Sequence, residues 1–108
     1  MKQFNAAHLE IKKSFSNGFE THPYECGWAD EVIFFVLVED IIGQGTFDAK
    51  VQISLDGVHW ADEGTAFETI SSCGLYFVKV KHFGNYIRLK TDIAGAEFKL
   101  QIQIASKG

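Results

Sequence analysis

The amino-acid sequence predicts an all-β fold: a single antiparallel β-sandwich of about eight strands, jelly-roll-like in arrangement, with residues 1–108 forming one domain. Apolar and polar residues alternate with a period of two along most of the chain, and helical spacing is nearly absent. Turn residues recur about every eight to twelve residues, the spacing expected of sandwiches and barrels. A chain of 108 residues can bury one hydrophobic core and is too short for a second.

Four segments carry the clearest strand patterns. Residues 7–13 and 31–40 are expected to be strands, separated by a long irregular connection that contains Asn, Gly and Pro. Apolar residues occupy every second position of residues 47–55 and again of residues 98–104, which predicts strands with one buried face. The segment GQGTFD, residues 43–48, is predicted to be a turn: it precedes a strand, whereas a phosphate-binding glycine loop precedes a helix.

A hairpin is predicted around the segment HFGN, because its Gly and Asn tolerate the positive φ of a tight turn and the flanking LYFVKV and YIRLKTD both alternate. One face of this hairpin would be basic and aromatic, with the side chains of Phe77, Lys79, Lys81, Tyr86, Arg88 and Lys90. The other would point into the core, with Tyr76, Val78, Val80, Ile87 and Leu89. The basic face is either an ordinary solvated surface or a contact surface for an acidic neighbour, a second copy or a glycan.

The segment EVIFFVLVED is apolar on both faces of its predicted strand. Val32, Phe34, Val36 and Val38 share one face, and Ile33, Phe35 and Leu37 share the other. A two-layer sandwich needs only one apolar face per strand. The second face is therefore covered by the long connection of residues 14–29, or it is a subunit interface.

The segment SLDGVHW contains an Asp-Gly pair between two apolar stretches. Asp56-Gly57 has the chemistry of a hairpin corner, and Trp60 alternates with Val58, so the indole is expected to pack inward across the end of the core. The Ser-x-Asp-Gly-x-x-Trp pattern also resembles a hairpin of discoidin-like carbohydrate-binding sandwiches. It resembles the sialidase Asp-box as well, but lacks that motif's residue between Asp and Gly.

A longer resemblance covers residues 45–104. The order GTFDAKVQISLDGVHWADEGTAFETI, a glycine turn at Gly74 and FGNYIRLKTDIAGAEFKLQIQI resembles small β-sandwich proteins encoded among phage structural genes, including capsid-decoration subunits. That resemblance implies an assembly role without catalysis. It transfers no functional residues to this chain.

No catalytic, cofactor-binding or metal-binding residue is predicted, and the chain is expected not to be an enzyme. SSCGL lacks the first glycine of a G-x-S-x-G nucleophile elbow. The pairs Glu39-Asp40 and Asp62-Glu63 are adjacent on strands, so each pair points its carboxylates to opposite faces. A zinc site using His22 and Cys26, or a calcium site using Asp56, Asp62 and Glu63, is the weaker alternative, because each lacks further ligands at suitable spacing.

The two cysteines, Cys26 and Cys73, precede apolar strands. A disulfide between them would close a long loop and stabilise the fold by roughly 4 kcal/mol in the chain-entropy model. Free thiols are favoured, because a single cysteine pair without a signal peptide fits a reducing compartment.

Net charge and hydropathy argue against two classes of partner, nucleic acid and the lipid bilayer. A net charge of −4 argues against nucleic acid, which requires a concentrated cationic surface. The longest apolar run, residues 32–38, is far shorter than the roughly 20 residues of a membrane helix, and no signal peptide is visible, so the expected location is cytoplasmic or within a virion-like particle.

The functional hypothesis is a non-enzymatic structural subunit that self-associates or docks on a larger particle. Its interface candidates are Ile33, Phe35, Leu37, Phe77, Lys79, Arg88 and Lys90. The alternative is a carbohydrate-binding module that stacks sugar rings on an exposed platform formed by Trp60, Trp28 or Tyr24.

Overall fold

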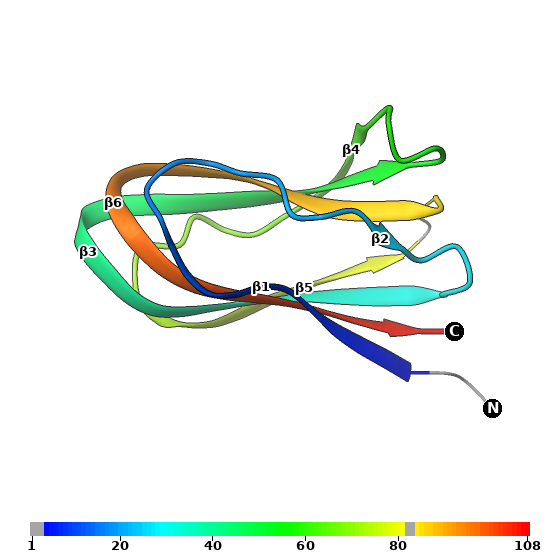
Figure 1. The fold of residues 1–108 in the computed structure, drawn as a ribbon, viewed down its shortest axis with the longest axis horizontal. Helices are drawn as coiled ribbons and strands as arrows, with labels where there is room; N and C mark the ends of the chain where they lie inside the picture. The colour runs from blue at the N-terminus through cyan, green and yellow to red at the C-terminus, as the bar shows by residue number, and fades with distance from the viewer. Residues whose placement is uncertain (1–3, 82–83) are drawn as a thin grey trace.

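The structure of the chain is a computed structural model that describes residues 4–81 and 84–108, with side chains from residue 14 onward within those ranges. It confirms the all-β prediction: these residues contain no helix, and their strands pair antiparallel throughout (Figure 1). The described residues form six strands, namely β1 (Phe4–Phe15), β2 (Tyr24–Glu25), β3 (Glu31–Ser54), β4 (Ala61–Ala66), β5 (Gly74–Lys81) and β6 (Tyr86–Lys107).

Two long strands organise the fold. β3 and β6 pair along nearly their whole lengths, from Glu31 opposite Lys107 to Ser54 opposite Tyr86. Both strands bend sharply at the same place, so the sheet folds over on itself into two layers (Figure 1). The first layer has the order β1-β6-β3-β5, and the second has the order β2-β6-β3-β4.

Glycines make the bend possible. Gly43 and Gly95 adopt positive φ angles of 100° and 81°, which other residues rarely adopt. The β3–β6 register shifts between Gly43 and Thr46, as expected where strands turn a corner between layers. A Cβ atom at Gly45 would overlap the carbonyl oxygen of Ala94 on the facing strand, so the two backbones approach closely only because Gly45 has no side chain.

The core lies between the inward faces of the two layers. The predicted inward set of the first half of β3 is confirmed, because all four side chains are at most 2% exposed. Phe47 on β3 and Phe98 on β6 are fully buried, and their ring centroids lie 5.8 Å apart. The largest fully buried side chains are Phe34, Phe47, Phe98, Ile70, Ile87, Leu89, Leu100, Ile102, Ile104, Val32, Val36 and Val38. Each buried side chain of this kind contributes about 1.5–3 kcal/mol.

The prediction of about eight strands was wrong because two pairs of predicted strands are continuous. Residues 31–40 and 47–55 belong largely to the single strand β3, and residues 86–92 and 98–104 both belong to β6. The segment 43–48 was predicted to be a turn, yet it continues β3 around the bend. Glycine clusters produce turns and sheet corners alike, so the sequence did not distinguish them.

The predicted hairpin between residues 75–80 and 86–92 was also wrong. β5 pairs with the first half of β3, where Phe77 lies opposite Phe35. The start of β6 pairs with the second half of β3 in the other layer, where Arg88 lies opposite Gln52. The predicted inward positions Val80 and Ile87 are nevertheless buried, because alternation determines which face points inward and not which strand lies alongside.

Candidate functional site

The segment from Ser54 to Trp60 forms the connection between β3 and β4, as its turn chemistry predicted. Gly57 has a φ of 79°, and its amide donates to Ser54 Oγ at 2.8 Å. Asp56 Oδ1 accepts hydrogen bonds from the amides of Val58 and His59, both at 2.9 Å, and Ser54 Oγ lies 3.0 Å from the same oxygen. Local backbone requirements therefore account for the Ser, the Asp and the Gly of this motif.

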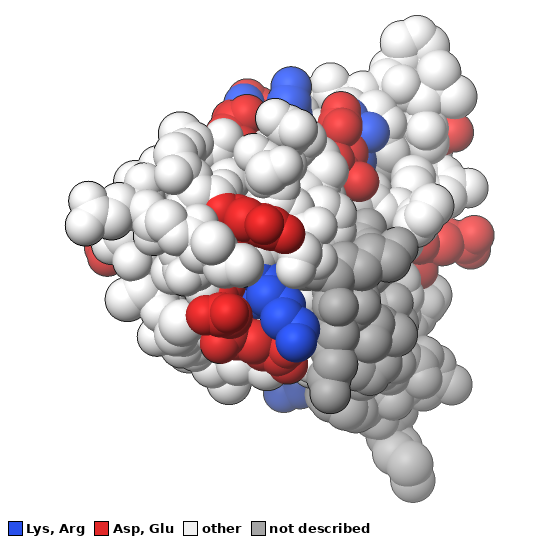
Figure 2. Space-filling model, turned by 60° about the vertical axis from the view of Figure 1, so that its left-hand side comes forward, with Lys and Arg blue, Asp and Glu red and all other residues white. Residues whose placement is uncertain are grey.

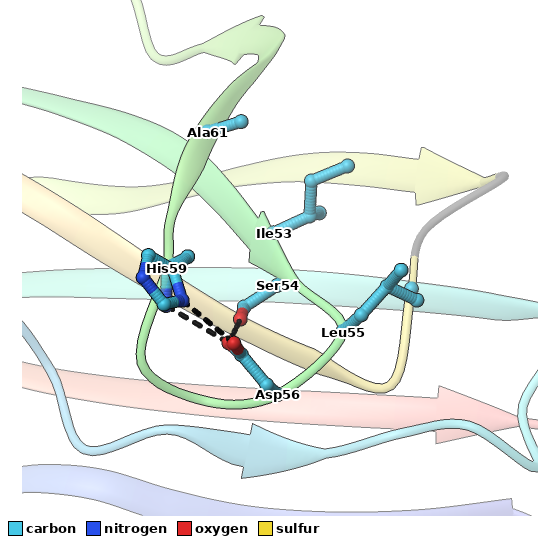
Figure 3. A pocket seen from close by; sticks show the side chains of 7 residues that line it. Ile53, Ser54, Leu55, Asp56, His59 and Ala61 are labelled. Atoms are coloured by element: carbon cyan, nitrogen blue, oxygen red, sulfur yellow. Dashed lines mark hydrogen bonds and ion pairs between the residues drawn. The ribbon is translucent and has the colours of Figure 1, made fainter.

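Asp56 and His59 also form a side-chain pair. Nδ1 of His59 lies 2.7 Å from Asp56 Oδ2, and both side chains are largely exposed (Figure 3). This hydrogen bond, with those from the amides of His59 and Val58 and from Ser54, holds the pKa of Asp56 below its ordinary value, and the same pair raises the pKa of His59. The Ser54 hydroxyl bonds to the carboxylate rather than to the imidazole, so it is not placed for activation as a nucleophile.

A hollow of about 400 Å³ lies beside this turn (Figure 3). Its lining is mainly apolar, from Ile53, Leu55 and Ala61, with Ser54, Asp56, His59 and Gly84 completing it. Leu55 is 76% exposed at its rim. The hollow has the chemistry to accept an apolar group, with the His59 imidazole at its edge.

The expected inward position of Trp60 was wrong. Trp60 is only partly buried, and the Arg88 guanidinium lies over its ring, 4.1 Å from the centroid. Arg88 Nε also donates to Gln52 Oε1 at 2.9 Å, and Gln52 Nε2 donates to Asp62 at 3.0 Å. The indole thus belongs to a polar network on the outer face of the second layer, where a cation above the ring replaces core packing.

Replacing Trp60 with alanine should lower the free energy of unfolding by about 1–2 kcal/mol, because a partly exposed cation–π contact is lost and no large cavity forms in the core. Urea unfolding followed by circular dichroism measures this change. A loss of about 3–5 kcal/mol would instead place the indole in the core, as alternation alone suggested.

An apolar surface covers the outer face of the first layer. It is formed by Ile33, Phe35, Leu37, Leu75 and Phe77, and is called here the β3–β5 face. Leu75 is 63% exposed and Phe77 is 57% exposed, while the three β3 side chains are half-buried. The ring centroids of Phe35 and Phe77 lie 6.2 Å apart, so the two rings pack against each other across the neighbouring strands. Sequence reasoning missed Leu75, although it lies two residues from Phe77 and so shares its face.

The connection between β1 and β3 does not cover this face. The Thr21 amide donates to the Leu89 carbonyl at 3.0 Å, and the Thr91 amide donates to the Phe19 carbonyl at 2.8 Å. Tyr24 pairs with Ile87. The connection therefore lies along β6 of the second layer, and of the two explanations offered for the double apolar pattern, cover by residues 14–29 was wrong.

The basic interface candidates lie in two separate places. Lys79 is exposed on β5, opposite Ile33 of the first layer. Arg88 and Lys90 are on the second layer, where Lys90 is exposed opposite Lys50. The single basic and aromatic surface expected from the hairpin does not form, because its two strands are in different layers.

Charged side chains on the second layer form an ion pair and hydrogen bonds with near neighbours. Lys50 Nζ lies 3.1 Å from an Asp62 oxygen, and hydrogen bonds from Gln52 and then Lys50 lower the Asp62 pKa. Figure 2 shows acidic and basic side chains interspersed among uncharged ones around the bent end of the molecule.

The three aromatic residues proposed as a sugar platform form no ring pair with one another among the described residues. Tyr24 is half-buried, and its hydroxyl lies 3.2 Å from Ser106 Oγ. Trp28 is 39% exposed, and its ring approaches Gly108. Among the described residues, the aromatic ring pairs include neither of these nor Trp60.

Both cysteines are free thiols, as predicted. Cys26 is fully buried, and this burial, with a smaller effect of Glu25, raises the pKa of its thiol to about 12. Cys73 is exposed just before β5. Only Cys73 is therefore placed to react with reagents in solution.

Metal-binding clusters and membrane-spanning helices are both absent from the part of the chain that the structure describes. No group of three or more His, Cys, Asp or Glu side chains there is arranged to hold a metal ion. No helix within the same residues is long and apolar enough to cross a membrane.

No protein-family model and no curated protein matches the chain, but solved structures share its fold. The SPBc2 prophage-derived protein YomS matches with a TM-score of 0.64 at 8% identity, over 100% of this chain and 96% of that one. A chain in the structure of infectious bursal disease virus Gt strain matches with a TM-score of 0.63 at 9% identity, over 98% of this chain and 32% of that one.

A third match is the Clostridium thermocellum xylanase 10B chain that contains CBM22-1 and GH10 modules. Its TM-score is 0.51 at 15% identity, over 99% of this chain and 25% of that one. This chain therefore spans about a quarter of the xylanase chain and a third of the viral one, and nearly the whole of YomS. At such low identities, what the chain shares with these proteins is their fold.

Proposed function

We propose that the chain is a non-enzymatic structural subunit, a single β-sandwich domain of jelly-roll type, that self-associates through the β3–β5 face. The assembled subunits would then dock on a larger, virion-like particle. Neither step requires a cofactor or a metal.

The observation that carries this proposal is the exposed apolar area of the β3–β5 face. A strand that already supplies a complete inward face has no need of a second apolar face for folding. Leu75 and Phe77 add two large side chains that are more than half exposed beside it. Contiguous apolar patches on a soluble protein mark sites of association, because their burial gains about 25 cal/mol per Å².

The fold likeness is consistent with this role. YomS is described as prophage-derived and is matched over almost its full length. The viral chain shares the same fold over a third of its length. These likenesses concern fold, so the assembly role rests on the β3–β5 face itself.

The proposal is tested by replacing both Leu75 and Phe77 with serine. Both side chains are mostly exposed, so the variant should keep its β-type circular dichroism while its mass in solution falls to that of a single chain. Light scattering after gel filtration measures the mass. Substitution at Phe35 and Leu37 is a less clean test, because those side chains are half-buried and support the sheet.

Leu55→Ser is the matched control, because Leu55 is 76% exposed but belongs to the hollow beside the Asp56 turn. It should leave the mass unchanged. If the double variant retains the mass of the wild type, or if Leu55→Ser dissociates the assembly equally well, the β3–β5 face is not the contact.

The second candidate function is carbohydrate binding. It is supported by the fold likeness to the chain with a CBM22-1 module and by Trp28, which is the most exposed of the three predicted platform residues. Retention of the wild type on a xylan or cellulose column, lost on Trp28→Ala without a change in the melting temperature, would favour this function over assembly.

A further inference from the structure

β5 is an edge strand. It pairs with β3 on one side, and no other described strand pairs with it on the opposite side. Its eight residues therefore present a row of backbone N–H and C=O groups along that free edge. Such an edge is a template for a strand from another chain.

Open space borders this edge. A groove of about 390 Å³ lies between residues 66–69 and residues 75–78 of β5. The exposed Leu75 and Phe77 contribute apolar lining, and Glu68 lies on the opposite side of the groove. An incoming strand would thus meet backbone groups, apolar side chains and one acidic residue together.

The free edge of β5 has a positive charge near one end and a negative charge near the other. Lys79 is exposed towards the end of β5, and within the described residues it forms no ion pair. Glu68 is exposed near the beginning of β5 and is likewise without an ion pair there. A second copy of β5 running antiparallel would bring its Lys79 towards Glu68 of the first copy.

We infer that β5 pairs with β5 of a second copy across a two-fold axis at Phe77, which extends the first layer into one sheet shared by two chains. This inference rests on the proposed function, and it adds a contact along the free edge of β5 to the contact through the β3–β5 face. Directly opposite residues of antiparallel strands point to the same face, so the outward residues of one copy must face those of the other. Placing Lys79 opposite Leu75, beside Glu68, sets Phe77 opposite its own copy and Cys73 opposite Lys81.

This register has two consequences. The two Phe77 rings meet at the axis, where an aromatic cross-strand pair is favourable. The β3–β5 faces of the two copies then lie side by side and form one continuous apolar surface, which stays available for the face-to-face contact of the proposed function. The lysines at position 79 are kept apart, whereas registers that place them opposite each other would be destabilised by repulsion between like charges.

Disulfide trapping tests the register with a natural thiol. Lys81→Cys places a new thiol opposite Cys73 of the second copy, and the buried Cys26 is not placed to compete. Mild oxidation with glutathione disulfide should convert most of this variant into a covalent dimer that disappears on reduction. Adding Cys73→Ser to the variant should abolish the dimer.

Lys79→Cys is the matched control, because it lies on the same face of β5 but would meet Leu75 instead of Cys73. It should remain uncrosslinked. A wild type that assembles while Lys81→Cys stays uncrosslinked, or a crosslink in Lys79→Cys alone, would overturn this pairing and leave the proposed function standing. A wild type that stays monomeric would overturn both.

Discussion

Replacing Phe98 with alanine should lower the free energy of unfolding by about 3–5 kcal/mol, the largest loss expected from a single substitution in this chain. Phe98 is fully buried, and its ring lies against that of Phe47 from the facing strand. It sits on the central strand β6, opposite both Phe15 of β1 and Ile41 of β3. Truncation would leave a cavity that these paired strands cannot close without distorting their ladders.

Urea unfolding followed by circular dichroism measures the loss at Phe98. Ile42→Ala is the control, since Ile42 is near the same bend but is 62% exposed. Its loss should stay within about 0.5 kcal/mol. Equal losses at the two positions would mean that the core does not extend to Phe98.

Replacing Gly95 with alanine should destabilise the fold by about 2–4 kcal/mol, from backbone strain and steric overlap together. Gly95 has a φ of 81°, and an added Cβ would lie 2.6 Å from the Gln44 carbonyl oxygen. That oxygen belongs to the backbone of the facing strand at the corner, so it cannot move aside as a flexible side chain could.

Gly64→Ala separates strain from overlap. Gly64 also has a positive φ, of 111°, but no atom lies within 4 Å of the position of its added Cβ. Its substitution should cost about 1 kcal/mol, from strain alone. If Gly95→Ala proves no more destabilising than Gly64→Ala, the backbones of β3 and β6 do not approach closely enough at the bend to exclude a Cβ atom.

Alternation predicted the inward faces well. The inward sets on both halves of β3 and on β6 were identified from the sequence because period-two patterning follows directly from strand geometry. Leu55 is the exception: it was expected to be inward but lies beyond the end of β3 and is 76% exposed. Gly57 was correctly identified as a turn residue, since an Asp-Gly pair between apolar stretches is typical of a turn that requires a positive φ. Such local rules need no knowledge of which strands are neighbours.

Strand pairing was predicted less well. The segment HFGN looked like a tight hairpin, yet β5 and the start of β6 belong to different layers. Adjacent strands usually pair, but here the two long bent strands β3 and β6 pair with each other along both layers and leave β5 at an edge. This global arrangement depends on the corner glycines, whose role the sequence does not separate from that of a turn.

The interface candidates stay a prediction, and the structure shows which of them share a surface. Ile33, Phe35 and Leu37 were chosen as candidates because they make the second side of the strand apolar, although the first side already supplies the core. Leu75 was missed although its spacing to Phe77 places both on one face, whereas Arg88 was placed on the wrong surface because that assignment depended on the partner of β5. Trp60 follows the alternation of its neighbours, but Arg88 supplied a favourable position outside the core.

The most direct test of self-association is the mass of the wild-type chain in solution, measured by sedimentation equilibrium over a range of concentrations. We predict a defined even multiple of the single-chain mass, with dissociation only on dilution. A mass that stays at one chain at every concentration would contradict assembly through the β3–β5 face.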